Sequence, residues 1–232
     1  MIEINKVYCG DCLDFLKDCP RPDLIVSDPP YEFHASGKGN MAKLKQMNSI
    51  KEIGTNSFNF SLIPKILSIQ KENINAYFFT NKTLLPHYLS YAVKHHISFD
   101  ILFMVKNNPL PCKNMHYVVD TEYIVFYRKG KACFNNHFGF NYYKKHYYIN
   151  IGDNDFLHPN QKPIELIQKL IKISSSKGDL VLDPFLGSGT TAVACIQLER
   201  NWVGIEKNLN YCEIANKRID FAKEQTKLEG FE

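Results

Sequence analysis

The sequence has no long apolar run and no low-complexity tract, and each absence excludes a class of protein. A membrane-spanning helix needs about 20 consecutive apolar residues, and no run in these 232 residues approaches that length. Residues 1–5 lack the basic and apolar regions of a signal peptide. We therefore expect a soluble, cytoplasmic protein whose chain folds rather than stays disordered.

Clusters of metal ligands and nucleophile triads are missing as well. The seven cysteines stand at irregular spacings, and Cys9 and Cys12 form a Cys-x-x-Cys with no second pair to complete a zinc site. We expect neither a metal site nor a disulfide, but reduced and partly buried thiols. The eight histidines suggest no Ser–His–Asp arrangement, so nothing indicates a hydrolase of that type.

The composition that is present suits a globular enzyme. Hydrophobic residues make up 44% of the chain, and a length of 232 residues suits one α/β domain, residues 1–232, with a sizeable core. The net charge of +4 is compatible with a polyanionic partner. It does not establish one, because many cytosolic enzymes are equally basic.

Four short segments share one pattern, an apolar and β-rich run that ends in an acidic residue before a turn. Continuous apolar runs of this length are typical of strands that are buried on both faces of a parallel sheet. Segments with helical patterns follow some of them, and we expect helices over 163–173, 190–198 and from Asn208 to about residue 223. This alternation predicts a doubly wound, mostly parallel sheet. The four runs are residues 6–11, 24–30, 180–184 and 202–206.

Ligands of such sheets bind beyond the carboxyl ends of the strands, where the strand order switches. Asp11, Asp28, Asp183 and Glu206 all stand at predicted carboxyl ends. We expect them to converge on one crevice, although most of the chain separates Asp28 from Asp183.

Other segments complete the expected fold. Residues 76–80, 99–105 and 121–127 read as strands, the last as an antiparallel edge. Residues 32–61 are polar with several glycines and lysines, so we expect a long mobile loop that covers the site as a lid. Residues 107–157 combine basic, asparagine and aromatic residues without a helical period.

The segment Asp28-Pro29-Pro30-Tyr31 has the chemistry to activate an exocyclic amine of a nucleobase. Such an amine is a poor nucleophile, because its lone pair is delocalised into the ring. The Asp28 carboxylate and the Pro29 carbonyl can accept hydrogen bonds from its two N–H groups. The carboxylate can also stabilise the positive charge that develops on nitrogen. Tyr31 offers a face on which the base can stack. The alternative is that Asp28 and the prolines only end a strand and start a turn.

A glycine-rich turn between a strand and a helix runs from Asp183 to Thr191. Glycines let a ligand approach the backbone, and free N–H groups at a helix start bind anions. Glu206 follows at about the 20-residue distance where nucleotide-binding folds place the acid that holds ribose hydroxyls. The third glycine of the dinucleotide fingerprint is missing, which favours S-adenosylmethionine over a dinucleotide.

Together these motifs resemble those of the amino-methyltransferases that make N6-methyladenine or N4-methylcytosine in DNA. The catalytic motif precedes the cofactor motif, as in the permuted β class of restriction–modification systems. The resemblance extends from residue 4 to about 218 and includes His158-Pro159-Asn160-Gln161-Lys162-Pro163 before the glycine turn. It implies a permuted, Rossmann-like fold, S-adenosylmethionine as the cofactor and double-stranded DNA as the substrate. An aspartate before Pro-Pro-Tyr favours adenine over cytosine.

The resemblance also implies roles for single residues. Asp28, Pro29, Pro30 and Tyr31 would be catalytic, and Glu206 would bind the ribose of the cofactor. Lys162 would meet the methionine carboxylate of the cofactor, and Asp11 and Cys12 would flank its adenine. The remaining implied cofactor contacts are Asp183, Phe185, Gly187, Ser188, Gly189 and Thr190.

Residues 107–157 occupy the position of the family's target-recognition region. Basic side chains there could bind phosphates, while many of the aromatic ones belong to a local core or a dimer contact. A homodimer and a cognate restriction endonuclease are the partners that this resemblance suggests. An RNA methyltransferase, a dinucleotide oxidoreductase and a binding protein without activity are the alternatives. The candidate DNA contacts are Arg128, Lys129, Lys131, Lys144 and Lys145.

Overall fold

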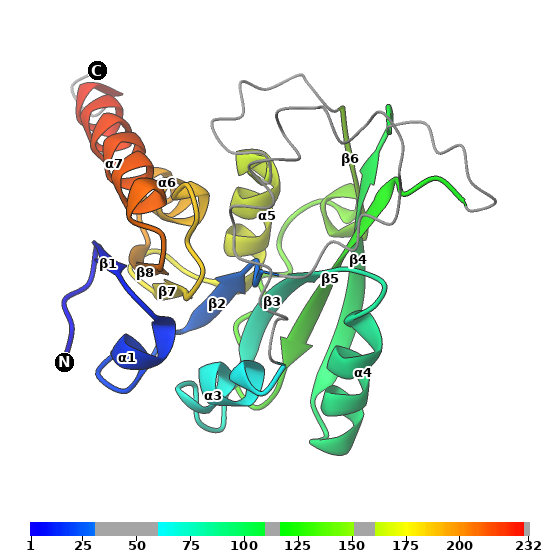
Figure 1. Cartoon of the computed structure of the whole chain (residues 1–232). Helices are drawn as coiled ribbons and strands as arrows, with labels where there is room; N and C mark the ends of the chain where they lie inside the picture. The colour runs from blue at the N-terminus through cyan, green and yellow to red at the C-terminus, as the bar shows by residue number, and fades with distance from the viewer. Residues whose placement is uncertain (31–59, 110–116, 151–160, 230–232) are drawn as a thin grey trace, which may run out of the picture.

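A single sheet of eight strands forms the centre of the molecule (Figure 1). The computed structural model describes residues 1–30, 60–109, 117–150 and 161–229. The strands lie in the order β1-β8-β7-β2-β3-β5-β4-β6. Their bounds are β1 (Lys6–Cys9), β2 (Leu24–Ser27), β3 (Asn75–Thr80), β4 (Ser98–Lys106), β5 (Thr121–Arg128), β6 (His146–Ile149), β7 (Leu180–Asp183) and β8 (Asn201–Glu206).

The sheet is mostly parallel, as the sequence predicts, and β5 is the strand that runs against its neighbours. It pairs in antiparallel fashion with β3 on one side and with β4 on the other. The prediction that residues 121–127 form an edge is therefore wrong, although their antiparallel direction is confirmed. The reason is that β4 leaves the neighbourhood of β3 and pairs outside β5, where it also binds β6 in parallel.

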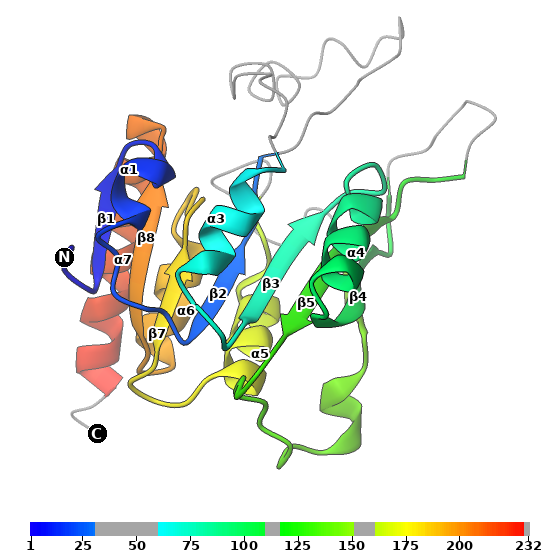
Figure 2. The same ribbon diagram turned by 90° about the horizontal axis from the view of Figure 1, so that it is seen from below.

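Helices cover both faces of the sheet (Figure 2). Alternate residues of the central strands point to opposite faces: Leu24 and Val26 pack on one side, and Ile25 packs on the other. The side of Ile25 carries α1 (Cys12–Leu16), α3 (Leu62–Ser68) and α4 (Leu85–Lys94). The side of Leu24 carries α5 (Ile164–Ser174), α6 (Thr190–Gln197) and α7 (Leu209–Glu229).

The three predicted helices are found, the first two with ends within one residue and the last extending to Glu229 instead of about residue 223. Asn208 begins the last of them, because its side-chain oxygen accepts from the backbone N–H of Asn210 at 2.9 Å. The predicted loop 32–61 lies, except for Phe60 and Ser61, outside the described residues. The described part of 107–157 contains β5, a short 3-10 helix η2 (Phe140–Tyr143) and the edge strand β6.

The strand order switches between β2 and β7. The chain leaves β2 through α3 toward β3, whereas it leaves β7 through α6 toward β8, on the opposite side of the sheet. The two strands pair in parallel, with Ile25 beside Leu182. Their carboxyl ends therefore border the crevice in which a doubly wound sheet binds ligands. Asp28 follows one of these ends, and Asp183 is the last residue of the other.

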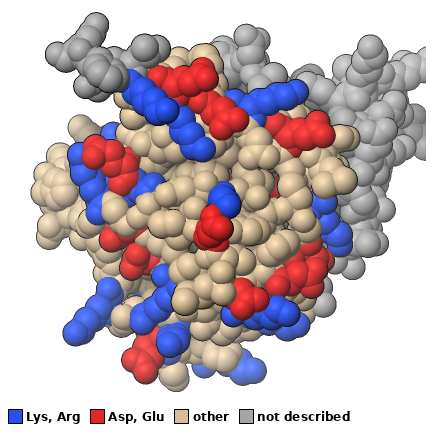
Figure 3. Space-filling view, turned by 90° about the vertical axis from the view of Figure 1, so that its left-hand side faces the viewer, with Lys and Arg blue, Asp and Glu red and all other residues tan. Residues whose placement is uncertain are grey.

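The surface of the described residues adds two further facts. None of the helices in this part of the chain combines the length and the apolar character needed to cross a membrane. On the side of the molecule that carries β1 and α7, acidic and basic side chains are interspersed (Figure 3). That side therefore presents no continuous basic surface to a nucleic acid.

Candidate active site

Asp28 lies at the switch point and presents its two carboxylate oxygens differently. One oxygen, Oδ2, accepts from the Lys162 ammonium at 2.9 Å. The other, Oδ1, is buried and has no hydrogen-bond partner among the described residues. A buried acceptor without a partner is costly, so a donor from a ligand would stabilise it. Pro29 is buried beside Asp28 and Pro30 is exposed, while Tyr31 lies outside the described residues.

The charges around Asp28 act on its pKa in opposite directions. Burial raises the pKa, the nearby Lys162 ammonium lowers it and Glu122 raises it, and the net direction is upward. Glu122 accepts from Lys162 at 2.9 Å and from Lys106 at 2.8 Å. Although burial alone would favour its neutral form, these two ammonium groups lower the pKa of Glu122 to about 2.

Asp183 shapes the glycine turn that follows β7. Its Oδ1 accepts from the backbone N–H of Phe185 at 3.1 Å, and its Oδ2 accepts from the Thr191 hydroxyl at 2.6 Å. Burial raises its pKa to about 7. Because both oxygens bind groups of the turn itself, Asp183 holds the turn in place rather than pointing away from it.

The two glycines of this turn have different surroundings. Both have left-handed backbone, with φ of +56° at Gly187 and +88° at Gly189, a conformation that costs other residues about 1–2 kcal/mol. A Cβ at Gly189 would stand 3.0 Å from the Cβ of Ala215 in α7. A Cβ at Gly187 would have no atom of the described residues within 4 Å. Gly189 therefore allows α7 to pack closely, and Gly187 leaves room for a ligand beside the backbone.

Ser188 and Thr190 are buried and bind Arg218 of α7. The guanidinium donates to the Ser188 carbonyl at 2.7 Å, to the Ser188 hydroxyl at 2.8 Å and to the Thr190 hydroxyl at 3.2 Å. The Ser188 hydroxyl in turn donates to Gln161 at 3.3 Å. The sequence analysis missed Arg218, because nothing in the local pattern of a helix indicates which distant turn one of its arginines contacts.

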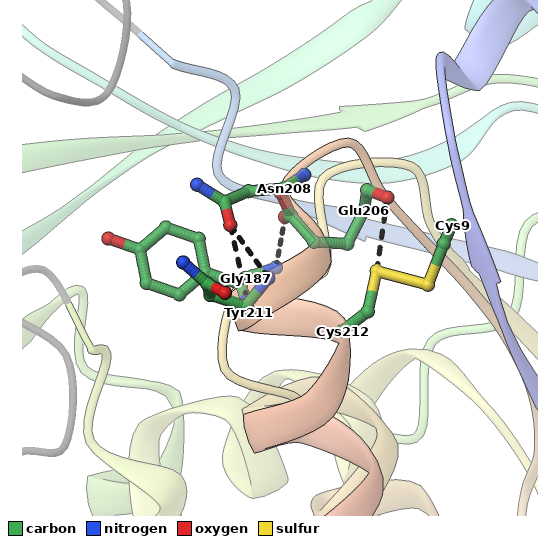
Figure 4. The surroundings of a disulfide bond; sticks show 7 residues. Cys9, Gly187, Glu206, Asn208, Tyr211 and Cys212 are labelled. Carbon is green, nitrogen blue, oxygen red and sulfur yellow. Dashed lines mark hydrogen bonds between the residues drawn. A yellow bond between two sulfur atoms is a disulfide. The ribbon is translucent and has the colours of Figure 1, made fainter.

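Glu206 lies beside the same turn, as predicted. Its Oε2 accepts from the backbone N–H of Gly187 at 2.8 Å, and its Oε1 accepts from the N–H of Asn208 at 2.8 Å (Figure 4). Each carboxylate oxygen has a second acceptor position. Glu206 can therefore hold the turn and still receive hydroxyl donors from a ligand.

Asp11 and Cys12 stand at the neighbouring strand end. Asp11 caps α1 through the N–H of Leu13 at 3.1 Å and pairs with Lys207 at 3.2 Å. Its pKa is lowered, mainly by the backbone hydrogen bond. The Cys12 thiol is buried, which raises its pKa to about 11. Parallel pairing of Cys9 with Glu206 puts this end beside that of β8, so Asp11, Glu206 and the turn border one region.

Lys162, which the resemblance assigns to the methionine carboxylate of the cofactor, binds two carboxylates of the protein itself. Its ammonium lies between two carboxylates of the protein, those of Asp28 and Glu122, and 5.2 Å from the centre of the Phe79 ring. Only 8% of the side chain is exposed. Lys162 is thus a neighbour of the predicted catalytic carboxylate. Phe185, the predicted adenine contact, is half-buried and packs on the core that faces α1, α3 and α4.

Comparisons with known proteins agree with this arrangement. The model of the N6/N4 methylase family, described as DNA methylase, matches residues 22–217. The chain belongs to this family. It is an S-adenosylmethionine-dependent DNA methyltransferase, and the open space at Gly187 beside Glu206 fits that cofactor.

Individual relatives match along nearly the whole methyltransferase. Type II methyltransferase M2.MboI of Moraxella bovis is 29% identical over 92% of this chain and 86% of its own length. DNA adenine methyltransferase YhdJ of Escherichia coli (strain K12) is 28% identical over 95% of this chain and 84% of its own. The crystal structure of the M1.HpyAVI–SAM complex superposes with a TM-score of 0.71 at 29% identity, covering 92% of this chain and 98% of the other.

A disulfide joins Cys9 of β1 to Cys212 of α7 in the methyltransferase (Figure 4). The expectation of reduced thiols is therefore wrong for this pair, whereas Cys12, Cys19, Cys133 and Cys195 are free. The error has a physical reason. The cysteines are 203 positions apart, and only the packing of α7 against β1 brings their Cα atoms within 6.2 Å, inside the range that a disulfide needs.

The candidate DNA contacts of the methyltransferase fall into two groups. Arg128 pairs with Asn75, the first residue of β3, so it lies at the opposite end of the sheet from Asp28. Its guanidinium is 3.7 Å from Asp100 and 5.0 Å from the centre of the Phe134 ring. Lys129 and Lys131 follow it directly. The structure therefore does not bring these three residues to the active site.

Lys144 and Lys145 lie just before the edge strand β6 and are exposed. Lys145 pairs with Asp100 at 2.6 Å. The local aromatic residues pack on one another, as in the stacked pair of Phe138 and Tyr142 with ring centres 4.6 Å apart. This agrees with the interpretation that many of them form a local core.

Proposed function

We propose that this methyltransferase methylates the exocyclic N6 amine of an adenine that is flipped out of double-stranded DNA. The buried, unpartnered Oδ1 of Asp28 beside the cofactor turn is the observation that supports this most directly. An adenine target is supported by the aspartate before Pro-Pro-Tyr and by the relative YhdJ, a DNA adenine methyltransferase. N4 of cytosine is the second candidate.

The proposed chemistry uses groups of this chain at each step. A base inside a duplex is out of reach, so it must leave the stack at a cost of a few kcal/mol. Asp28 Oδ1 and the Pro29 carbonyl accept hydrogen bonds from the two N–H groups of the amine, which frees its lone pair. Tyr31 stacks on the base.

Bound S-adenosylmethionine supplies the methyl group, whose bond to sulfur breaks as the bond to nitrogen forms. The Asp28 carboxylate stabilises the positive charge that develops on the nitrogen. The excess proton leaves through the hydrogen bond to Oδ1, and the raised pKa of Asp28 makes it a better acceptor than an ordinary aspartate.

We further propose that the glycine turn and the two strand ends beside it bind the cofactor. Glu206 binds the ribose hydroxyls of the cofactor, and Gly187 leaves room for the cofactor to approach the backbone of the turn. Asp11 and Cys12 border the adenine of the cofactor. Asp183, Ser188, Gly189 and Thr190 maintain the shape of the turn, and Phe185 packs against the adenine.

The domain organisation, the cellular location and the protein partners are also part of this proposal. The whole chain acts as one methyltransferase domain, in which residues 32–61 form the lid and residues 107–157 the target-recognition region. It works in the cytoplasm as a homodimer within a restriction–modification system, beside a cognate endonuclease. The support is the likeness to Type II methyltransferases.

The test is to incubate the purified protein with double-stranded DNA and methyl-labelled S-adenosylmethionine, and then to separate the nucleosides. Label in N6-methyladenine is the expected result. Label in N4-methylcytosine would transfer the same mechanism to the second candidate. Label that appears only in an RNA control would identify an RNA methyltransferase, and no label at all would indicate a binding protein.

A further inference from the structure

Four side chains of alternating charge form a chain that ends at the catalytic carboxylate. Asp28 after β2 binds Lys162, which precedes α5; Lys162 binds Glu122 of β5; and Glu122 binds Lys106 at the end of β4. The three contacts measure 2.9, 2.9 and 2.8 Å. Segments from four separate parts of the sequence are needed to build it.

The ammonium of Lys162 belongs to the least exposed of these four linked side chains. Its side chain is 8% exposed, compared with 22% for Glu122 and 25% for Asp28. Buried ion pairs of this kind are often no more stable than apolar residues of equal size. Stability is therefore a weak explanation for placing a lysine between two acids, and a role toward the site accounts for it better.

We propose that Lys162 and Glu122 are positioning residues for the methyl transfer, which hold Asp28 so that Oδ1 alone faces the target amine. This rests on the proposed function of Asp28. Lys162 occupies Oδ2, which fixes the rotation of the carboxylate, and Glu122 fixes the ammonium from its other side. Lys106 in turn holds the second oxygen of Glu122. The role differs from binding the carboxylate of the cofactor, because the two carboxylates that the ammonium binds here, those of Asp28 and Glu122, belong to the protein.

The same contacts affect the pKa of Asp28. The two positioning residues, Lys162 and Glu122, shift this pKa in opposite directions. Activity needs the ionised carboxylate, so it is lost as the pH falls through the pKa of Asp28. Lys162 lowers this pKa and Glu122 raises it. Asp183, at the end of β7, also interacts electrostatically with Asp28, and it is the same in every variant compared below.

The experiment measures single-turnover methylation from pH 5 to pH 9 in Lys162→Met, Glu122→Gln and Lys162→Arg. In the plot of rate against pH, the acid limb is the part where the rate falls toward low pH. We expect this limb to move to higher pH in Lys162→Met and to lower pH in Glu122→Gln. The plateau rate should fall by about 10²-fold in Lys162→Met, because misplacement of a reacting group by about 1 Å costs that much. Lys162→Arg keeps the positive charge beside Asp28, so its acid limb should lie at the wild-type pH.

The exposed ion pair of Lys177 and Glu199 provides matched controls, Lys177→Met and Glu199→Gln, which should leave the rate and its limb unchanged. S-adenosylmethionine affinity by calorimetry is the second readout, and we expect it to stay within about twofold of wild type in all variants. Should Lys162→Met not fold, the proposal is still tested by the shift to lower pH in Glu122→Gln together with the unshifted limb in Lys162→Arg.

Two results would overturn it. One is an acid limb that does not move, or moves in the same direction, in Lys162→Met and Glu122→Gln. The other is a lysine variant that loses cofactor affinity at an unchanged limb, which would return Lys162 to the cofactor site. Failure of the proposed function looks different, because an Asp28→Ala protein would then methylate at the wild-type rate.

Discussion

One carboxylate oxygen, Asp28 Oδ1, has the central role at the scale of single residues. Asp28→Asn keeps an acceptor oxygen but removes the negative charge, and Asp28→Ala removes both. We expect single-turnover methylation to fall by at least about 10²–10³-fold in the first variant and further in the second. Rapid chemical quench resolves this step from product release.

Cofactor affinity separates the outcomes of the Asp28 experiment. Both variants should bind S-adenosylmethionine nearly as wild type, because Asp28 lies across the switch point from the turn. A variant that is slow only because it no longer binds the cofactor would move Asp28 from catalysis to cofactor binding.

Glu206 gives a second prediction at this scale. Its two oxygens accept from the backbone of Gly187 and Asn208, and a ribose would use the acceptor positions that remain. We expect Glu206→Ala to weaken S-adenosylmethionine binding by about 1.5–3 kcal/mol, the range for hydrogen bonds to a charged group. Calorimetry on a folded variant measures it, with Glu213→Ala, an exposed acid in α7, as the control. Equal affinity in both variants would remove Glu206 from the site.

The sequence predicted the residues at strand ends better than it predicted their partners. Asp28, Asp183 and Glu206 were identifiable because a strand pattern followed by an acid can be read from a few neighbouring letters. Contacts such as those of Lys162 with Glu122 and of Arg218 with Ser188 join segments that no local pattern connects. Their geometry depends on the assembled sheet.

The turn after β7 is where an element-scale prediction can be made. Gly189→Ala adds a methyl group in left-handed backbone and 3.0 Å from Ala215, whereas Gly187→Ala adds it in open space. We expect Gly189→Ala to lower the free energy of unfolding by about 2 kcal/mol or more, and Gly187→Ala by about 1 kcal/mol. Denaturant titration measures both.

The two glycine variants should rank differently in cofactor binding. Gly187→Ala fills the space beside the backbone, so it should weaken S-adenosylmethionine binding more than its small loss of stability suggests. If Gly187→Ala binds the cofactor as wild type, the ligand does not approach that glycine.

Elements with a continuous apolar run or an apolar helix face were predicted closely, and elements without such a pattern were not. The helix after Pro163 has an apolar face in Leu166, Ile167 and Leu170 that is visible in the sequence, and all three are buried. Strand β6 is as short as β2 and β7, but it is half exposed at the edge of the sheet and lacks their continuous apolar run. Strand β5 was recognised as antiparallel, but its place inside the sheet depends on how β4 folds back, which its own residues do not encode.

The candidate DNA contacts lie in two parts of the molecule, and a pair of double variants tests which part faces DNA. We expect Lys144→Ala/Lys145→Ala to weaken DNA binding for all sequences and to reduce the slope of log affinity against log salt by at most about 2. Lys129→Ala/Lys131→Ala, at the opposite end from Asp28, is the matched control and should leave the slope unchanged. Fluorescence anisotropy over a salt series measures both.

Comparing the salt slopes of the two double variants shows at which end of the sheet the DNA binds. A slope that changes only in the Lys129 and Lys131 variant would place the nucleic acid at the amino ends of the parallel strands. That result would separate the DNA from the carboxyl-end crevice and contradict the proposed arrangement.

The pairing of β2 with β7 also determines when this enzyme becomes active during its own synthesis. Asp28 leaves the ribosome before the strand that completes its crevice, Leu180–Asp183, which lies far along the chain from it. Strand β1 waits longer still, since its neighbour β8 begins at Asn201. Pairings of such long range form slowly, and until they form, the edges of β1 and β2 are open to other chains. A nascent chain without β7 thus carries Asp28, the proposed catalytic residue, but not the turn that would bring a methyl donor to it, so methylation starts only after that turn has been added.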